Sequence, residues 1–282
     1  MLVAQIIVDG LMIGGMYSLE AMGLLIIYGV LRVLNLAHGE FLLIGSYLTI
    51  AFFSLNPLLG PAISIMVLLL VGLALQRYLL TDKITGNRPT TPLIITFGIS
   101  ITLQNVYLEL FTANPYGIST PFPSLNVLGV YFPVSTLSAF LIAIVSLVVI
   151  YFVLNRTFLG MAIRAATKSP DDASLIGIDV RRVKTIAFVL GAVLAAIAGS
   201  VMTLQYSVTP YTGLTFLMIA FTVIVLGGFS VPGVLAAGFV LGIAGSVWGF
   251  YLPMEYTNAV VFAIFLIVII IRPSGLVGKE GK

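Results

Sequence analysis

The chain has 282 residues, of which 60% are hydrophobic and only 8% are charged, and its mean hydropathy is +1.18. An ordinary soluble domain has about 25% charged residues, so this composition excludes a soluble protein and predicts a membrane protein. The formal net charge of +3 is spread over loops between apolar runs, so it does not indicate nucleic-acid binding. The absence of cysteine excludes disulfides and thiolate chemistry.

Apolar runs follow one another along the whole chain. We expect an all-α, polytopic transmembrane bundle of about 8–10 spans, because a helix needs about 20 apolar residues to cross a bilayer and barrel strands would alternate instead. There is no linker, so we expect residues 1–282 to form a single transmembrane domain. The first run is not a cleavable signal, because it lacks a basic start and contains Asp9. The runs lie near residues 4–29, 38–54, 58–76, 92–112, 134–155, 186–206, 214–230, 232–250 and 256–271.

The first run carries a carboxyl group well inside it, at Glu20. A carboxylate at the bilayer centre costs about 2.5–3.5 kcal/mol on insertion scales, so Glu20 must be paired, protonated or facing water. Asp9 lies on the same helix face about three turns earlier, which allows a wet stripe along this helix. The sequence does not identify a partner for Glu20.

Polar residues then interrupt the apolar sequence between the first and second runs. Taken singly, each has an ordinary explanation as part of a membrane-flanking turn, for example an arginine that reaches the headgroups. As a cluster they indicate a broken segment on a substrate path, and residues 227–233 break the C-terminal half in a similar way. The cluster consists of Arg32, Asn35, His38 and Glu40, flanked by Gly29 and Gly39.

The fourth run has a polar stripe on one helix face, at the three- and four-residue spacing of a single face. Such a stripe either holds helices together or lines a path. The stripe consists of Gly98, Thr102, Asn105, Glu109 and Thr112, with Gln104 beside it. Glycines at four-residue spacing elsewhere, such as Gly10 with Gly14 and Gly238 with Gly242, predict close helix crossings.

Residues 156–184 hold nine of the 23 charges, six basic and three acidic, and residues 185–254 hold none. The first part, residues 156–168, can form an amphipathic helix. We expect Phe158, Ala162, Ala165 and Ala166 on its inner side and Arg164 and Lys168 on its outer side.

A second, very short helix follows in this loop, with both ends specified. Ser169 can cap it and Pro170 suits its first position. Asp171 and Asp172 complement the helix dipole, and Gly177 is a typical terminating residue. A helix this short is marginal alone in water, so it either packs on the ends of its own spans or docks into a soluble ATPase as a coupling helix.

Basic residues set the orientation, because cytoplasmic loops are rich in lysine and arginine. The loop of residues 114–134 has no lysine or arginine and is placed outside, which puts the C-terminus in the cytoplasm and, if the first run crosses the membrane once, the N-terminus outside. The basic positions used are Arg77, Lys83 and Arg88, the six of residues 156–184, and Arg272, Lys279 and Lys282.

Four segments together resemble the permease subunits of branched-chain amino acid ABC importers, and the resemblance covers nearly the whole chain. They are GMYSL at residues 15–19 followed by IYGVLRVLNLAHGE at 27–40, FGISITLQN at 97–105, the loop of residues 157–182, and RPSGL at 272–276.

The resemblance implies a helical permease, without enzymatic activity or cofactor, that imports leucine, isoleucine, valine or related substrates by alternating access in the cell membrane. It implies a second permease subunit, identical or paralogous, two cytoplasmic ATPases and an extracytoplasmic binding protein; the chain itself has no ATP-binding glycine loop. We expect the substrate pathway at Glu20, Asn35, His38, Glu40, Gly98, Thr102, Gln104 and Asn105. We expect ATPase coupling at Arg164, Pro170, Asp171, Asp172, Leu175 and Gly177.

Other functions stay open. Glu20 departs from the family pattern, so urea or short amides are an alternative cargo. A proton-coupled carrier would use Glu20, Glu40 and Glu109, but it leaves the cytoplasmic helix without a task. A metal site or catalytic triad is disfavoured, because His38 is the single histidine.

Overall fold

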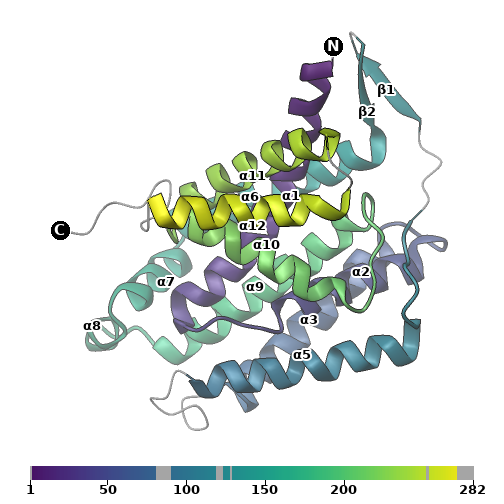
Figure 1. Cartoon of the computed structure of the whole chain (residues 1–282). Coiled ribbons are helices and arrows are strands. Elements are labelled where there is room, and N and C mark those ends of the chain that lie inside the picture. The colour runs from purple at the N-terminus through teal and green to yellow at the C-terminus, as the bar shows by residue number, and fades with distance from the viewer. Residues whose placement is uncertain (1, 81–89, 119–122, 128, 252–253, 272–282) are drawn as a thin grey trace.

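The computed structural model describes residues 2–80, 90–118, 123–127, 129–251 and 254–271. In this part of the chain, eleven helices and one small hairpin form the bundle drawn in Figure 1. The helices are α1 (Leu2–Leu31), α2 (His38–Phe53), α3 (Leu59–Tyr78), α5 (Thr90–Phe111), α6 (Val134–Arg156), α7 (Phe158–Lys168), α8 (Pro170–Leu175), α9 (Val180–Met202), α10 (Thr212–Leu226), α11 (Val231–Tyr251) and α12 (Met254–Ile271).

The predicted all-α class is confirmed. Six helices of the described chain are long and apolar enough to cross a membrane, namely α1, α3, α5, α6, α9 and α11. The apolar helices α2 and α10 and the segment Ala259–Val268 of α12 are shorter. One feature was not expected: strands β1 (Ser124–Val127) and β2 (Val130–Pro133) pair antiparallel in the loop before α6.

The centre of the bundle is the crossing of α1 and α11, and glycines make it close. A Cβ atom at Gly10 would overlap the backbone of Ile243, and one at Gly14 would overlap the backbone of Phe239. On the opposite helix, a Cβ atom at Gly242 would overlap the backbone of α1. The predicted glycine crossing is confirmed. In lipid, apolar side chains gain little free energy by contacting one another in place of acyl chains. Close backbone packing at glycines therefore stabilises the crossing.

Helix α9 packs against α1, α2 and α3 through small and hydroxyl residues. A Cβ atom at Gly199 would overlap the carbonyl oxygen of Leu42 on α2. The Ser46 hydroxyl donates to the Gly199 carbonyl oxygen at 3.0 Å, and the Thr49 hydroxyl donates to the Ser200 hydroxyl at 2.9 Å. These buried hydroxyls fix the position of α2 against α9.

The two ends of the bundle are distinct. At one end the Gln5 side chain and the Tyr131 backbone exchange two hydrogen bonds of 2.8 Å, and Tyr116 pairs with Val208. At the other end lie α7 and α8, and α12 ends on their side (Figure 1). Five of the basic positions used for orientation, Lys83, Arg88, Arg272, Lys279 and Lys282, lie outside the described residues, as does the RPSGL segment.

Helix α2 begins inside the bundle. A Cβ atom at Gly23 would lie 3.1 Å from the His38 ring, while α1 continues eight residues further to Leu31. At 1.5 Å per residue this is about 12 Å. The chain therefore turns back into the bundle over residues 32–37, with Arg32 at a φ of 55°. The predicted break between the first two runs is a re-entrant turn.

Candidate functional site

A buried polar centre lies where α2 begins beside the middle of α1. Glu20 and His38 are both fully buried, and the His38 Nε2 atom lies 3.3 Å from the backbone oxygen of Glu20. Neither carboxyl oxygen of Glu20 has a hydrogen-bond partner among the described residues, and the same is true of His38 Nδ1. Buried polar atoms are rarely left without partners. Within this chain Glu20 therefore neither meets a donor nor faces water.

Glu40 lies in the first turn of α2, where three helices meet. Its carboxyl oxygens come within about 3 Å of the space that a Cβ atom would take at Gly213, in the first turn of α10. The Ser100 hydroxyl of α5 donates to Glu40 Oε1 at 3.3 Å, and the Tyr107 hydroxyl donates to the Glu40 backbone oxygen at 2.8 Å. Glu40 therefore links α2, α5 and the beginning of α10.

The turn before α2 is held by side chains on both sides. Asn35 is buried, and its Oδ1 atom accepts from the Ala37 amide at 3.1 Å. The Leu36 amide donates to the Thr96 hydroxyl of α5 at 3.2 Å. Asn35 therefore shapes the turn, and α5 supports it from outside.

Helix α5 presents two different polar faces. Thr96, Ser100 and Tyr107 face the bundle and contact the segment that begins α2. The stripe predicted from the sequence lies on the other face: Gly98, Thr102 and Asn105 are exposed, and nothing lies within 4 Å of a Cβ atom at Gly98. Gln104 is half-buried between the two faces.

The structure therefore brings together only four of the eight residues predicted for the pathway. Glu20, Asn35, His38 and Glu40 gather around the start of α2. The exposed stripe of α5 points away from them. Sequence reasoning missed the inner face of α5, although the spacing of Thr96, Ser100 and Tyr107 at four and seven residues marks a common side of a helix.

A cleft of about 590 Å³ opens at the end of the bundle that holds Gln5 and Tyr131. It lies between α1, α10 and α11 and includes Asp9, Tyr17 and Tyr206. The Tyr17 and Tyr206 side chains both line the cleft and interact with each other. Tyr17 stands one turn before Glu20 on α1, so the Tyr17–Tyr206 pair lies between Asp9 at this end and the buried carboxyl of Glu20.

The two helices of the predicted coupling loop are present. Helix α7 begins at Phe158, and the Thr157 hydroxyl caps it by accepting from the Gly160 amide at 3.2 Å. Ala162, Ile163 and Ala166 are buried on its inner face. The expectation for Phe158 was wrong: this side chain is 76% exposed, because it stands in the first turn and does not share the inner face.

Helix α8 has both predicted ends. The Ser169 hydroxyl accepts from the Asp172 amide at 3.3 Å, Pro170 occupies the first position, and Gly177 has a φ of 85°. Ala173 is buried and holds the helix against the bundle. Asp171 and Asp172 are exposed, as is Arg164, which donates to the Leu154 carbonyl oxygen at the end of α6.

Large apolar side chains are exposed on this charged loop. Leu175 is 84% exposed and Ile176 is 76% exposed, although α8 lies in the most charged part of the chain. We call these two residues, together with the exposed Phe158 and Met161 of α7, the α7–α8 face. Exposed apolar groups rimmed by polar ones are typical of surfaces that contact another protein or the membrane.

Arg32 connects the loop to the re-entrant turn. Its guanidinium donates to the Thr167 carbonyl oxygen near the end of α7 at 2.7 Å. Three residues later in the chain, Asn35 shapes the start of α2. Arg32 therefore links the end of α7 to the turn that precedes His38.

Among the described residues, no group of three or more histidine, cysteine, aspartate or glutamate side chains is placed to hold a metal ion. The fold and the site define a polytopic helical membrane protein with a re-entrant polar centre and a structured loop at one end.

The chain belongs to the family of branched-chain amino acid transport system permease components, whose model matches residues 6–269. It is 32% identical to the high-affinity branched-chain amino acid permease protein BraD of Pseudomonas aeruginosa, over 98% of this chain and 95% of the relative. It is 30% identical to LivH of Escherichia coli, over 96% and 94% of the two chains. LivM of Escherichia coli is 26% identical over 92% of this chain and 67% of that protein. No solved structure matches the chain.

Proposed function

We propose that this chain is the membrane-spanning permease subunit of an ABC importer for branched-chain amino acids. The observation that carries the proposal is the α7–α8 face, where exposed Leu175 and Ile176 stand on a short helix with both ends capped. The chain is similar to BraD and LivH, which are both branched-chain amino acid permease proteins, and this similarity supports the cargo.

Soluble ATPase subunits bind the α7–α8 face in this proposal. The pair of residues Leu175 and Ile176 enters an apolar groove, and Asp171 and Asp172 contact the polar rim around it, as in other interfaces with an apolar centre. The contact of Arg32 with Thr167 then passes the movement of α7 to the turn before α2. We assign α7 and α8 to the cytoplasm on the positive-inside rule, and with them the end of α12.

A second permease subunit covers the exposed stripe of α5. Gly98, Thr102 and Asn105 lie on a span that touches the rest of the bundle along one face only, so their polar groups are available to a partner. The substrate path then runs between two subunits, with Gln104 at its edge and Glu40 behind α5. Because the chain is similar to both LivH and LivM, this partner is either a copy of the chain or a paralogue.

The cleft beside Asp9 and Tyr206 lies at the extracytoplasmic end in this orientation. An extracytoplasmic binding protein delivers substrate at this end. Along α1, the buried Glu20 lies one turn deeper in the bundle than Tyr17. In this proposal the Tyr17–Tyr206 pair is therefore the barrier between the cleft and the polar centre.

The test is ATP-driven leucine uptake by the assembled transporter in proteoliposomes, with the variant Leu175→Asp. We expect loss of ATPase co-purification and at least a tenfold fall in uptake, because a charge replaces an apolar contact. The matched control is Leu55→Asp, a 75% exposed leucine between α2 and α3. Normal ATPase binding by the Leu175 variant would refute the coupling role.

Cargo is tested in the same vesicles by competition. Isoleucine and valine are expected to reduce leucine uptake, whereas urea and acetamide are not. Uptake driven by a pH gradient in the absence of ATP and of the ATPase subunits would instead support the proton-coupled carrier.

A further inference from the structure

A second cleft, of about 760 Å³, lies between the last turns of α3 and the first turns of α9. Helix α9 follows α8 directly, so this cleft is at the same end of the bundle as α7 and α8. It is distinct from the polar centre at the start of α2 and from the α7–α8 face. The proposed substrate pathway and the proposed ATPase contact do not include this cleft.

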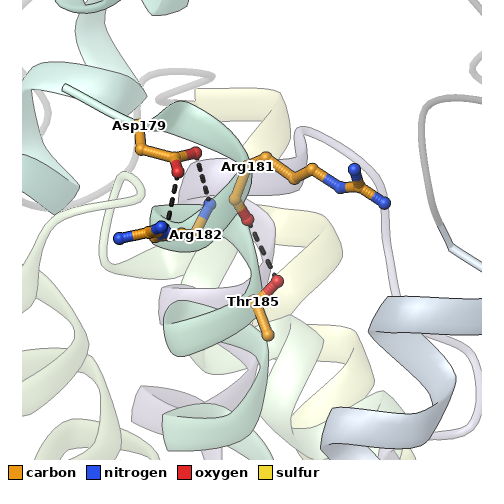
Figure 2. A network of polar contacts seen from close by, with 4 residues as sticks. All are labelled: Asp179, Arg181, Arg182 and Thr185. Atoms are coloured by element: carbon orange, nitrogen blue, oxygen red, sulfur yellow. Dashed lines mark hydrogen bonds and ion pairs between the residues drawn. The ribbon is translucent and has the colours of Figure 1, made fainter. Parts of the chain in front are cut away.

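The cleft is strongly basic. Arg77 of α3 and Arg181, Arg182 and Lys184 of α9 line it, and no aspartate or glutamate of the described residues does. Arg182 is partly neutralised, because its Nε atom lies 2.8 Å from Asp179 Oδ2. Figure 2 shows that the Arg181 side chain extends away from this ion pair, while its backbone oxygen accepts from the Thr185 hydroxyl at 3.0 Å. Arg77 and Arg181 are thus placed to bind an anion.

A buried acceptor lies in the same cleft. Gln76 is only 4% exposed, and its Oε1 atom has no hydrogen-bond partner among the described residues. Its Nε2 atom donates to the Leu80 carbonyl oxygen at 3.4 Å, which assigns the orientation of the amide. The free oxygen requires a donor such as a hydroxyl group. The arginines are therefore suited to a phosphate group, and the Gln76 oxygen is suited to a hydroxyl group beside that phosphate.

An exposed apolar ridge leads along α3 to the cleft. Met66, Leu69, Leu70 and Leu73 are all exposed and are spaced as one helix face. In a membrane-spanning helix such a ridge faces acyl chains. Leu73 also lines the cleft, so the ridge and the basic residues are continuous.

We propose that this cleft binds one anionic phospholipid with a hydroxylated headgroup, of the phosphatidylglycerol type. The phosphate lies between Arg77 and Arg181, a headgroup hydroxyl donates to Gln76, and an acyl chain follows the ridge of α3. Basic pockets between spans at the cytoplasmic side of a membrane bind anionic headgroups in this way. The site does not depend on which substrate the chain carries.

The test is native mass spectrometry of the full-length chain, delipidated in detergent and then titrated with phosphatidylglycerol or phosphatidylcholine of identical acyl chains. We expect phosphatidylglycerol to bind at least tenfold more tightly. The double variant Arg77→Gln/Arg181→Gln should weaken it about thirtyfold, since each basic residue near the surface contributes about a fivefold factor. The matched control is Arg156→Gln/Lys168→Gln, which removes two exposed charges outside the cleft and should change nothing.

Phosphatidylmethanol, which has the same charge but no headgroup hydroxyl, isolates the role of Gln76. The unmodified chain should prefer phosphatidylglycerol over it, and Gln76→Leu should remove that preference alone. Equal binding of phosphatidylglycerol and phosphatidylcholine, or an equal loss in the control variant, would overturn the proposal. Displacement of the lipid by millimolar inorganic phosphate, or by assembly with the ATPase subunits, would overturn it as well.

A photoactivatable phosphatidylglycerol keeps the test independent of whether the variants fold. In the unmodified chain, crosslinks should concentrate at Leu73, Tyr78 and Ile186, which surround the cleft. Crosslinks spread evenly over the exposed faces of α5 and α6 would show that the lipid has no specific site here.

Discussion

Replacing glycine by alanine should change stability differently at two positions in membrane-spanning helices. A Cβ atom at Gly199 would overlap the Leu42 backbone of α2, and a backbone atom cannot rotate away as a side chain can. Gly199→Ala therefore overpacks the contact between α2 and α9, which costs about 1–3 kcal/mol. At Gly98 nothing lies within 4 Å of a Cβ atom. Gly98→Ala should be neutral or gain up to about 1 kcal/mol from helix propensity.

The assay is thermal unfolding of each purified full-length variant in one detergent, followed by size-exclusion chromatography of a fluorescent fusion. A cost of 1 kcal/mol lowers the melting temperature by about 2–4 °C for a chain of this size. Gly199→Ala should thus melt several degrees below wild type, and Gly98→Ala should not. Equal melting temperatures for the two variants would refute the packing argument.

The same pair separates stability from assembly. If a second permease subunit covers the exposed stripe of α5, Gly98→Ala should reduce co-purification of that subunit and uptake while leaving the single chain stable. Full uptake together with unchanged assembly would place the path away from Gly98.

Three further substitutions test single contacts. Ser169→Ala removes the cap of α8 and should cost about 1 kcal/mol locally, which hydrogen exchange of residues 170–177 would show as faster exchange. Gly177→Ala strains a φ of 85° by roughly 1–2 kcal/mol and should speed exchange there, with Gly177→Asn tolerated better; equal exchange in both would contradict this. Tyr107→Phe removes the donor to the Glu40 carbonyl oxygen and should lower stability by about 0.5–1.5 kcal/mol in thermal unfolding.

Much of the secondary structure follows from local sequence. The apolar runs predict the helices to within about six residues, because a span must satisfy its own backbone in lipid. The ends of α8 were also predictable, since Ser169, Pro170 and Gly177 act on their own neighbours. The hairpin before α6 was not predicted, because its strands are short and exposed.

The arrangement of the candidate site follows only in part from the local sequence. The cluster of Asn35, His38 and Glu40 was visible as a break in an apolar run. The sequence did not show that residues 32–37 turn back into the bundle, because this turn depends on contacts of His38 with α1 and of Glu40 with α10. Likewise the polar spacing of α5 is a property of the helix alone, but which face the bundle covers is not.

The sequence by itself therefore determined the membrane class, the positions of the helices and the caps of α8. These depend on apolar length and on hydrogen bonds between near neighbours. Only the tertiary structure decided that Glu20 lies beside His38, that Arg32 contacts Thr167, and that Gly98 and Thr102 face outward. Helices in lipid have no strongly polar outside to orient them, so the packing of small residues between spans sets which side chains meet.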